Sequence, residues 1–192
     1  DASVHDRAIA ELQISRRLNA PLASSMGRLF DAAAAVLGVH RGPQFEGQAA
    51  MELEAVAGHR AGRVLALPVD TAPEVWQLDP LPLLITLGER HRAGEDTVQL
   101  AADFHATILD ATARLVATCC ERFGLDTVAL GGGVFQNARF ASGLPTLIRA
   151  HGLRILQPRE LGPNDGGVSF GQAAVAATLL AAEAGRPTSA GG

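Results

Sequence analysis

Residues 127–137 read TVALGGGVFQN, and this stretch decides the fold class that we expect. Its first four residues, 127–130, are mostly apolar and predict a buried strand, whereas residues 134–150 have the apolar spacing of a helix. The same order recurs downstream, where a predicted strand at 153–156 leads through a glycine-rich turn to a predicted helix at 167–185. Strands that alternate with helices predict parallel βαβ units, so we expect an α/β fold.

Upstream of this unit the sequence predicts mainly helices. Apolar residues recur three and four positions apart, and serine, glycine or proline stands at the ends of the runs. The expected helices cover residues 5–18, 26–37, 47–57, 80–90 and 95–123, and short strands are expected at 63–69 and 74–78. The chain of 192 residues then forms one domain over 1–185 with a flexible tail at 186–192.

The composition argues against several classes of function. A net charge of −4 predicts neither a nucleic-acid surface nor a basic membrane patch. No apolar run reaches the roughly 20 residues of a membrane span, and no signal peptide is recognisable. All 16 basic residues are arginine, so a P-loop lysine and a Schiff-base lysine are excluded within this chain.

The two cysteines indicate the expected compartment. Cys119 and Cys120 are adjacent and form neither a disulfide framework nor a CxxC metal pair. A reducing, cytoplasmic location is therefore expected. The chain also opens at Asp1 without an initiator methionine, which suggests that it is part of a longer protein.

The triple glycine that follows the strand at 127–130 is the first candidate site. Glycines permit backbone angles that a Cβ forbids and let a ligand approach the main chain, and a helix N-terminus favours an anionic ligand. We expect Asn137 to lie about one turn into the helix and to reach a base or ribose. The alternative is a tight turn with a solvated Asn137. A Rossmann dinucleotide site is not expected, because the motif is not GxGxxG.

The loop after the strand at 153–156 is the second candidate site. It contains Asn164, Asp165, Gly166 and Gly167, and Asp165 is expected at the N-cap of the next helix. Capping is one interpretation of this carboxylate. The other is a hard oxygen ligand for a metal ion beside a phosphate. Because the loop follows the next strand of the same sheet, we expect it to converge with the triple glycine.

Two further polar groups lie near the start of the chain. Arg28 and Asp31 are three residues apart on an expected helix, where a surface ion pair is the simplest interpretation. Glu46 and Gly47 form a second glycine–carboxylate pair, in which Glu46 need only be an acidic residue at a helix start.

Five stretches in the order found here resemble one known family. They are SSMGRLFDAAAAVLG (24–38), FEGQAAMELEA (45–55), DFH (103–105), LGGGVFQNARF (130–140) and PNDGGVSFGQA (163–173). They resemble the C-terminal part of the hydrogenase-maturation carbamoyltransferases of the HypF family, over about residues 13–182. That part is similar to the tRNA threonylcarbamoyl-adenosine synthases of the TsaD type. The resemblance implies a lobe of the actin-like, Hsp70 and sugar-kinase ATPase superfamily, with a short parallel-rich sheet flanked by many helices.

The resemblance also implies a reaction. Carbamoyl phosphate and ATP give carbamoyl-adenylate, and the carbamoyl group passes to the C-terminal cysteine of a HypE-type acceptor protein. There it is dehydrated to a nitrile, the source of the cyanide ligands of [NiFe]-hydrogenases. The remaining domains of the parent enzyme, carbamoyl phosphate and the acceptor protein are thus the implied partners.

Five residues are implied in nucleotide binding. Asp31 in GRLFDA matches the family aspartate that holds the adenylate ribose, and Gly47 in FEGQ matches a glycine that lines the same nucleotide. Gly131, Gly132 and Asn137 match the loop on the adenosine side.

The implied metal site is incomplete in this chain. Asp165 of PNDGG matches a carboxylate ligand of a divalent ion, such as Mg²⁺, Fe²⁺ or Zn²⁺. The family's two metal-binding histidines come from an HxxxH-type motif on the preceding lobe, and no histidine pair here has that spacing. His105 in DFH is interpreted as a structural or lobe-contact residue. The upstream domains of full-length members are also absent from these 192 residues.

Two alternatives to the HypF interpretation remain at this point. One is a fold relative, either an O-carbamoyltransferase or a tRNA threonylcarbamoyltransferase. The other is a nucleotide-binding module without turnover of its own.

Overall fold

The computed structural model describes residues 3–40, 42, 44–70 and 74–184, so the expected tail at 186–192 lies outside the described residues. The described elements, in chain order, are α1 (Val4–Arg16), α2 (Met26–Val36), α3 (Gln48–Ala57), β1 (Val69–Asp70), β2 (Gln77–Leu78), α4 (Leu81–Arg92), α5 (Thr97–Phe123), β3 (Thr127–Ala129), η1 (Gly133–Gln136), α6 (Ala138–Ala150), β4 (Arg154–Leu156), η2 (Asp165–Gly167) and α7 (Val168–Ala184), where η marks a 3₁₀-helix. The predicted helices are confirmed to within a few residues at their ends.

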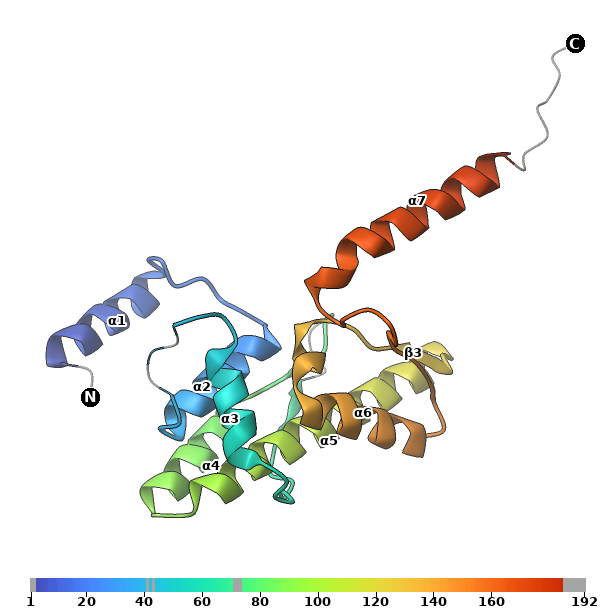
Figure 1. Ribbon diagram of the computed structural model, residues 1–192. Helices are drawn as coiled ribbons and strands as arrows, with labels where there is room; N and C mark the ends of the chain where they lie inside the picture. The colour runs from blue at the N-terminus through green and yellow to red at the C-terminus, as the bar shows by residue number, and fades with distance from the viewer. Residues whose placement is uncertain (1–2, 41, 43, 71–73, 185–192) are drawn as a thin grey trace, which may run out of the picture.

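Helix α5 is the centre of the molecule. It starts at the N-cap Asp96, ends at Gly124 in the left-handed conformation, and buries residues along much of its length. Figure 1 shows α2, α3 and α4 gathered along one part of α5 and α6 along another. The core is formed where these helices meet, and its largest fully buried side chains include Phe30, Phe104, Phe140, Leu53, Leu83 and Ile108.

The predicted βαβ unit is present. Strands β3 and β4 pair in parallel, with Thr127 opposite Arg154 and Ala129 opposite Leu156, and α6 connects them. The other described strands, β1 and β2, form a short antiparallel pair. The expected α/β class is thus confirmed as a helix-rich fold with two small sheets.

The predicted strand at 63–69 is wrong for most of its length, because only Val69 enters a ladder. Helix side chains replace a strand partner here: the Arg63 N–H donates to Asp103 Oδ1 at 2.8 Å, and the Leu65 N–H donates to Thr107 Oγ1 at 2.9 Å. A Cβ on Gly62 would lie 2.0 Å from the Ala102 carbonyl oxygen, so glycine lets the segment approach α5 this closely. Two backbone N–H groups of the segment thus bond to side chains of α5 rather than to a neighbouring strand.

Asp103 anchors that segment from inside the core. Its side chain is fully buried and accepts from Arg63 Nη2 at 2.7 Å and from Gln99 Nε2 at 2.8 Å. Arg90 Nη1 lies 3.2 Å from the same carboxylate. Burial opposes ionisation, but the hydrogen bonds from Arg63 and Gln99 outweigh it, so the pKa of Asp103 lies below its usual value.

Replacing Asp103 by asparagine is expected to lower the free energy of unfolding by about 2 kcal/mol at pH 7, since buried donors lose a charged partner. Because the folded pKa is below the unfolded one, the carboxylate's contribution is complete above about pH 4 and falls as the pH drops further. Urea unfolding at pH 7 and at low pH measures both effects. Asp110→Asn, on the same helix with a surface pair to Arg114, is the control and should change stability by under about 0.5 kcal/mol. Equal losses in the two variants would contradict the role of Asp103.

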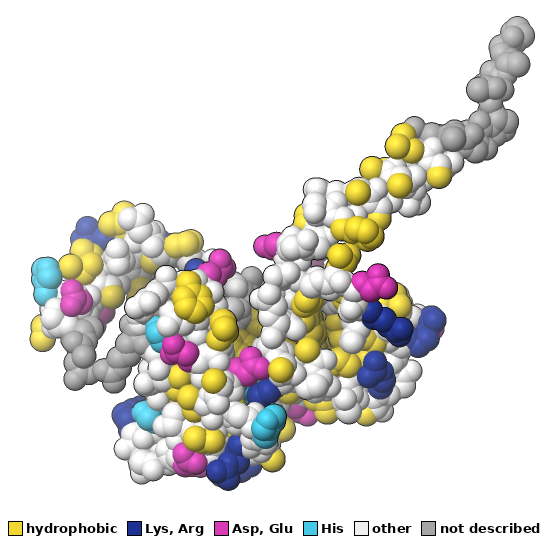
Figure 2. Space-filling model, in the orientation of Figure 1, with side chains coloured by type: hydrophobic (Ala, Val, Ile, Leu, Met, Phe, Trp, Pro, Cys, Tyr) yellow, Lys and Arg dark blue, Asp and Glu magenta, His cyan; other side chains and the backbone are white. Residues whose placement is uncertain are grey.

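Two helices extend away from this core. Helix α1 buries no residue, and α7 projects from the body of the protein (Figure 1). Apolar side chains follow α7 along its length (Figure 2), and Val175, Leu179 and Leu180 are 61%, 61% and 65% exposed. Within the described ranges, no helix is both long and apolar enough to cross a membrane.

Candidate functional site

The two glycine-rich loops that follow β3 and β4 converge, as predicted. The Leu130 N–H donates to the Leu156 carbonyl at 2.8 Å, which continues the sheet by one residue. The Gly132 N–H then donates to the Pro163 carbonyl at 2.5 Å. Backbone hydrogen bonds therefore join the loop of Gly131–Gly133 to the loop that carries Asp165, and we call the pair the glycine loops.

The first glycine loop presents bare backbone. Gly131, Gly132 and Gly133 are exposed, and no atom lies within 4 Å of the position that a Cβ would take at any of them. Gly132 has φ +104°, which L side chains rarely adopt. The backbone conformation thus favours glycine at position 132, and all three glycines leave open space for a ligand along the main chain.

Asn137 lies at the start of helix α6, which corrects the prediction that it lies one turn inside the helix. Residues Gly133–Gln136 form a separate 3₁₀ turn, and Asn137 then caps α6, its Oδ1 accepting from the Phe140 N–H at 3.1 Å. Its Nδ2 lies 3.3 Å from His105 Nε2, and only 9% of the residue is exposed. The alternative of a solvated Asn137 is therefore wrong.

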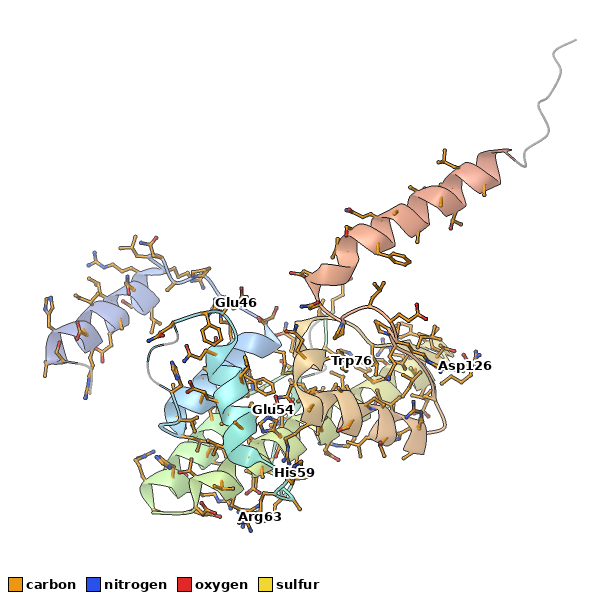
Figure 3. All side chains as sticks on the ribbon, viewed as in Figure 1. Glu46, Glu54, His59, Arg63, Trp76 and Asp126 are labelled. Atoms are coloured by element: carbon orange, nitrogen blue, oxygen red, sulfur yellow. The ribbon has the colours of Figure 1, made fainter. Side chains whose placement is uncertain are left out.

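Helices α3 and α6 are tied together beside this loop. Glu54 on α3 accepts from the Ala138 N–H, a free donor of the first turn of α6, at 2.7 Å. In return, Arg139 donates to the carbonyls of Gly58 and Arg60 at 2.7 and 2.8 Å. Figure 3 shows Glu54 within α3, well away from Glu46, which precedes the start of that helix. The polar contacts hold the N-terminus of α6 in place.

An aromatic cluster joins helix α2 to the same place. The Phe30 ring centroid lies 5.0 Å from that of Phe104, 5.4 Å from that of His105 and 5.7 Å from that of Phe140, all in edge-to-face geometry. Asp31, the next residue of α2, is thereby held on a helix that packs directly against α5 and α6. That the Asp31 carboxylate lies at the nucleotide stays a prediction.

Asp31 and Gly47 sit at the surface of α2 and α3. The predicted ion pair is present, with Arg28 Nη1 donating to Asp31 Oδ2 at 3.2 Å; the Asp31 side chain is 32% exposed. Gly47 is the N-cap of α3 and has φ +81°, and nothing lies within 4 Å of a Cβ there. Both residues therefore have a face open to a ligand. Helices α2 and α3 pack against each other.

Asp165 is exposed and is not the cap of its helix. The cap is Asn164, whose Oδ1 accepts from the Gly166 N–H at 3.3 Å, so the capping interpretation of Asp165 is wrong. Among the described residues, its carboxylate has no hydrogen-bond or ion-pair partner, and no group of three or more His, Cys, Asp or Glu side chains could hold a metal ion. The described part of the chain does not form a complete metal site.

Two contributors to this region were not predicted as parts of the site. His105 meets Asn137 from 32 residues away, and Glu54 meets Ala138 from 84 residues away. The sequence interpretation of His105 as structural agrees with its complete burial. The DFH motif was the available signal for His105, whereas no local pattern indicates the partner of Glu54.

Comparison with known proteins agrees with this geometry. The sequence family described as "Carbamoyltransferase, Kae1-like Domain, second subdomain" matches residues 2–172. Carbamoyltransferase HypF2 of Cupriavidus necator is 38% identical over 189 residues, which cover 85% of this chain and 23% of the relative. Carbamoyltransferase HypF of Rhizobium leguminosarum bv. viciae is 41% identical over 161 residues, or 83% of this chain and 20% of the relative.

A solved structure shows the same fold. The crystal structure of full-length HypF in the phosphate- and nucleotide-bound form superposes with a TM-score of 0.86 at 32% identity, covering 93% of this chain and 24% of that one. The fold and the glycine loops are thus those of the second subdomain of a Kae1-like carbamoyltransferase domain. The chain belongs to the HypF carbamoyltransferase family. It spans about a quarter or less of the length of these two relatives and of the chain in the solved structure.

Proposed function

We propose that this chain is the nucleotide-binding lobe of a hydrogenase-maturation carbamoyltransferase. In the complete enzyme, carbamoyl phosphate, ATP and water give carbamoyl-adenylate, phosphate and pyrophosphate. The carbamoyl group then passes to the C-terminal cysteine of a HypE-type acceptor protein, and AMP is released. The joined glycine loops carry the proposal, since they expose main-chain groups beside a helix N-terminus where no side chain blocks a ligand. A related HypF structure contains phosphate and nucleotide, which supports the same assignment.

The nucleotide site is assigned to five residues on three elements. Gly131 and Gly132 offer the main chain on the adenosine side, and Asn137 defines the end of that loop. Asp31 is proposed for the ribose, as the resemblance of GRLFDA to the family motif implies, and its partly exposed carboxylate supports this role. Gly47 lines the nucleotide with bare backbone at the start of α3.

Asp165 is assigned as one carboxylate ligand of a divalent metal ion. Its side chain is exposed on the second glycine loop, and that loop is bonded to the first. The other ligands must come from outside the described residues, as no metal-binding group of side chains is present among these. The chain alone is therefore expected to bind nucleotide without turning over carbamoyl phosphate.

The remaining domains of a parent enzyme are the proposed partners of the exposed apolar surface. A helix that is apolar all round is normally buried, and α7 carries exposed Val175, Leu179 and Leu180. This arrangement supports packing of α7 against another domain, and the resemblance implies that both would be lobes of the actin-like, Hsp70 and sugar-kinase ATPase superfamily. A cytoplasmic location accompanies the proposal, since hydrogenase-maturation chemistry with a free cysteine acceptor requires reduced thiols.

Nucleotide binding is tested by titrating the chain with ATP and Mg²⁺ in a calorimeter. We expect weak, saturable binding, and we expect Gly132→Ala to weaken it about tenfold or more, or about 1.4 kcal/mol, because a Cβ at positive φ distorts the loop. Gly152→Ala is the matched control, since Gly152 also has positive φ, +78°, but lies in the turn between α6 and β4. Absence of ATP binding by a chain with native circular dichroism, or equal affinity of both variants, would contradict the assignment.

A further inference from the structure

His105 lies in the core and contacts Asn137, which follows the first glycine loop at the start of α6. Its ring is fully buried on α5, edge-to-face with Phe30 and Phe104. Its Nδ1 is 2.7 Å from the Ala101 carbonyl oxygen one turn earlier, and its Nε2 is 3.3 Å from Asn137 Nδ2. Both ring nitrogens therefore have a partner.

These partners determine which ring nitrogen carries the proton. A carbonyl oxygen can only accept, so Nδ1 must be the donor to Ala101. In the neutral ring Nε2 is then the acceptor, and the Asn137 group that faces it must be the NH₂ donor. Burial lowers the pKa of His105 to about 4, and the charge of Arg139 adds to this effect. The ring is thus neutral at physiological pH.

The same bond fixes the orientation of the Asn137 amide. When Asn137 Nδ2 donates to His105, Asn137 Oδ1 faces the Phe140 N–H and accepts a hydrogen bond from it at 3.1 Å. A rotation of the amide by half a turn would set its oxygen against the lone pair of Nε2 and its NH₂ against a backbone N–H. Only one orientation satisfies both neighbours, and it leaves one N–H of Nδ2 for another acceptor.

We propose that His105 is a positioning residue that acts through Asn137: its neutral Nε2 holds the Asn137 amide in the one orientation that offers an N–H to the nucleotide. That this orientation matters for a ligand rests on the proposed nucleotide function. His105 itself is fully buried and does not contact the ligand. The ligand atom that meets Asn137 is accordingly an acceptor, as a ring nitrogen or a ribose oxygen would be.

Nitrogen-15 NMR of the chain tests the orientation without any ligand. We expect the His105 ring in the Nδ1–H tautomer at pH 7, and we expect His105→Leu to shift the Asn137 side-chain NH₂ resonances. The opposite tautomer, or unchanged Asn137 NH₂ resonances in that variant, would overturn the inference.

Two variants test the consequence for ATP affinity. His105→Gln and His105→Leu both lose the bond to Ala101, but only glutamine can place an acceptor near the position of Nε2. We expect His105→Leu to weaken ATP binding about tenfold, which is the effect of one lost hydrogen bond to a ligand group. We expect His105→Gln to retain most of the wild-type ATP affinity. In an Asn137→Ala background the leucine variant should have no further effect, because the two residues act through one contact.

The outcomes separate this inference from the proposed function. Equal ATP affinities of the leucine and glutamine variants, in a chain that binds ATP through Asn137, would overturn the positioning role alone. A chain that shows the expected tautomer but binds no ATP would contradict the nucleotide assignment and leave the His105–Asn137 contact confirmed.

Discussion

Replacing Phe30 by alanine is expected to lower the free energy of unfolding by about 3–5 kcal/mol, the usual cost of removing a buried phenylalanine. The ring is 2% exposed and contacts Phe104, His105 and Phe140 edge-to-face, so its loss opens a cavity where α2, α5 and α6 meet. Native domains are stable by roughly 5–15 kcal/mol, so this loss would be a large fraction of the total. Urea unfolding followed by circular dichroism measures the change.

Phe45→Ala is the control for that experiment. Phe45 is 55% exposed, so the same truncation should change stability by under about 0.5 kcal/mol. A loss below about 1 kcal/mol in Phe30→Ala would show that the three helices are not held by this ring. Because Phe30 precedes Asp31, we also expect ATP affinity to fall in Phe30→Ala under conditions in which the variant is folded.

Asp165→Ala in the full-length enzyme is expected to reduce carbamoyl transfer by about a hundredfold or more, the scale seen when a group that stabilises transition-state charge is removed. The fold should survive, since the Asp165 carboxylate has no partner among the described residues and Asn164 caps the helix instead. Carbamoyl transfer to the acceptor protein and the unfolding midpoint are the two measurements.

Glu160→Ala is the matched control, because Glu160 is an exposed carboxylate of the same loop. It should retain the wild-type rate. Wild-type transfer by Asp165→Ala would remove the metal-ligand assignment, and equal slowing of both variants would indicate a general effect of charge on the loop.

Local patterns predicted most of the helices. The apolar spacing of α2 and α5 and the glycine that ends α5 depend on residues within a few positions of each other, so they can be identified in one sequence. The serine expected to cap α2 is less informative, because Ser25 makes no side-chain cap hydrogen bond. The turn before α6 was predicted less well. Val134–Gln136 continue the apolar pattern of the helix, and that pattern does not distinguish a 3₁₀ turn from the first turn of an α-helix.

One error arose where a distant element replaces a local partner, and another where an adjacent residue takes the predicted position. Residues 63–68 have the composition of a strand, but Asp103 and Thr107 of α5 bind their backbone in place of a neighbouring strand. Asp165 has the chemistry of a cap, but Asn164 takes that position. In both places the chemistry of the residues was predicted correctly, but the groups that they contact were not.

The sequence by itself determined the βαβ order, the two glycine loops and the family to which the chain belongs. These depend on residue types at close spacing, which backbone sterics and helix capping constrain locally. Only the tertiary structure decided how the loops meet, that Asn137 begins α6, and that His105 and Glu54 support that start from 32 and 84 residues away. Contacts of that separation depend on how α3, α5 and α6 pack, and packing is set by the whole core rather than by any one segment.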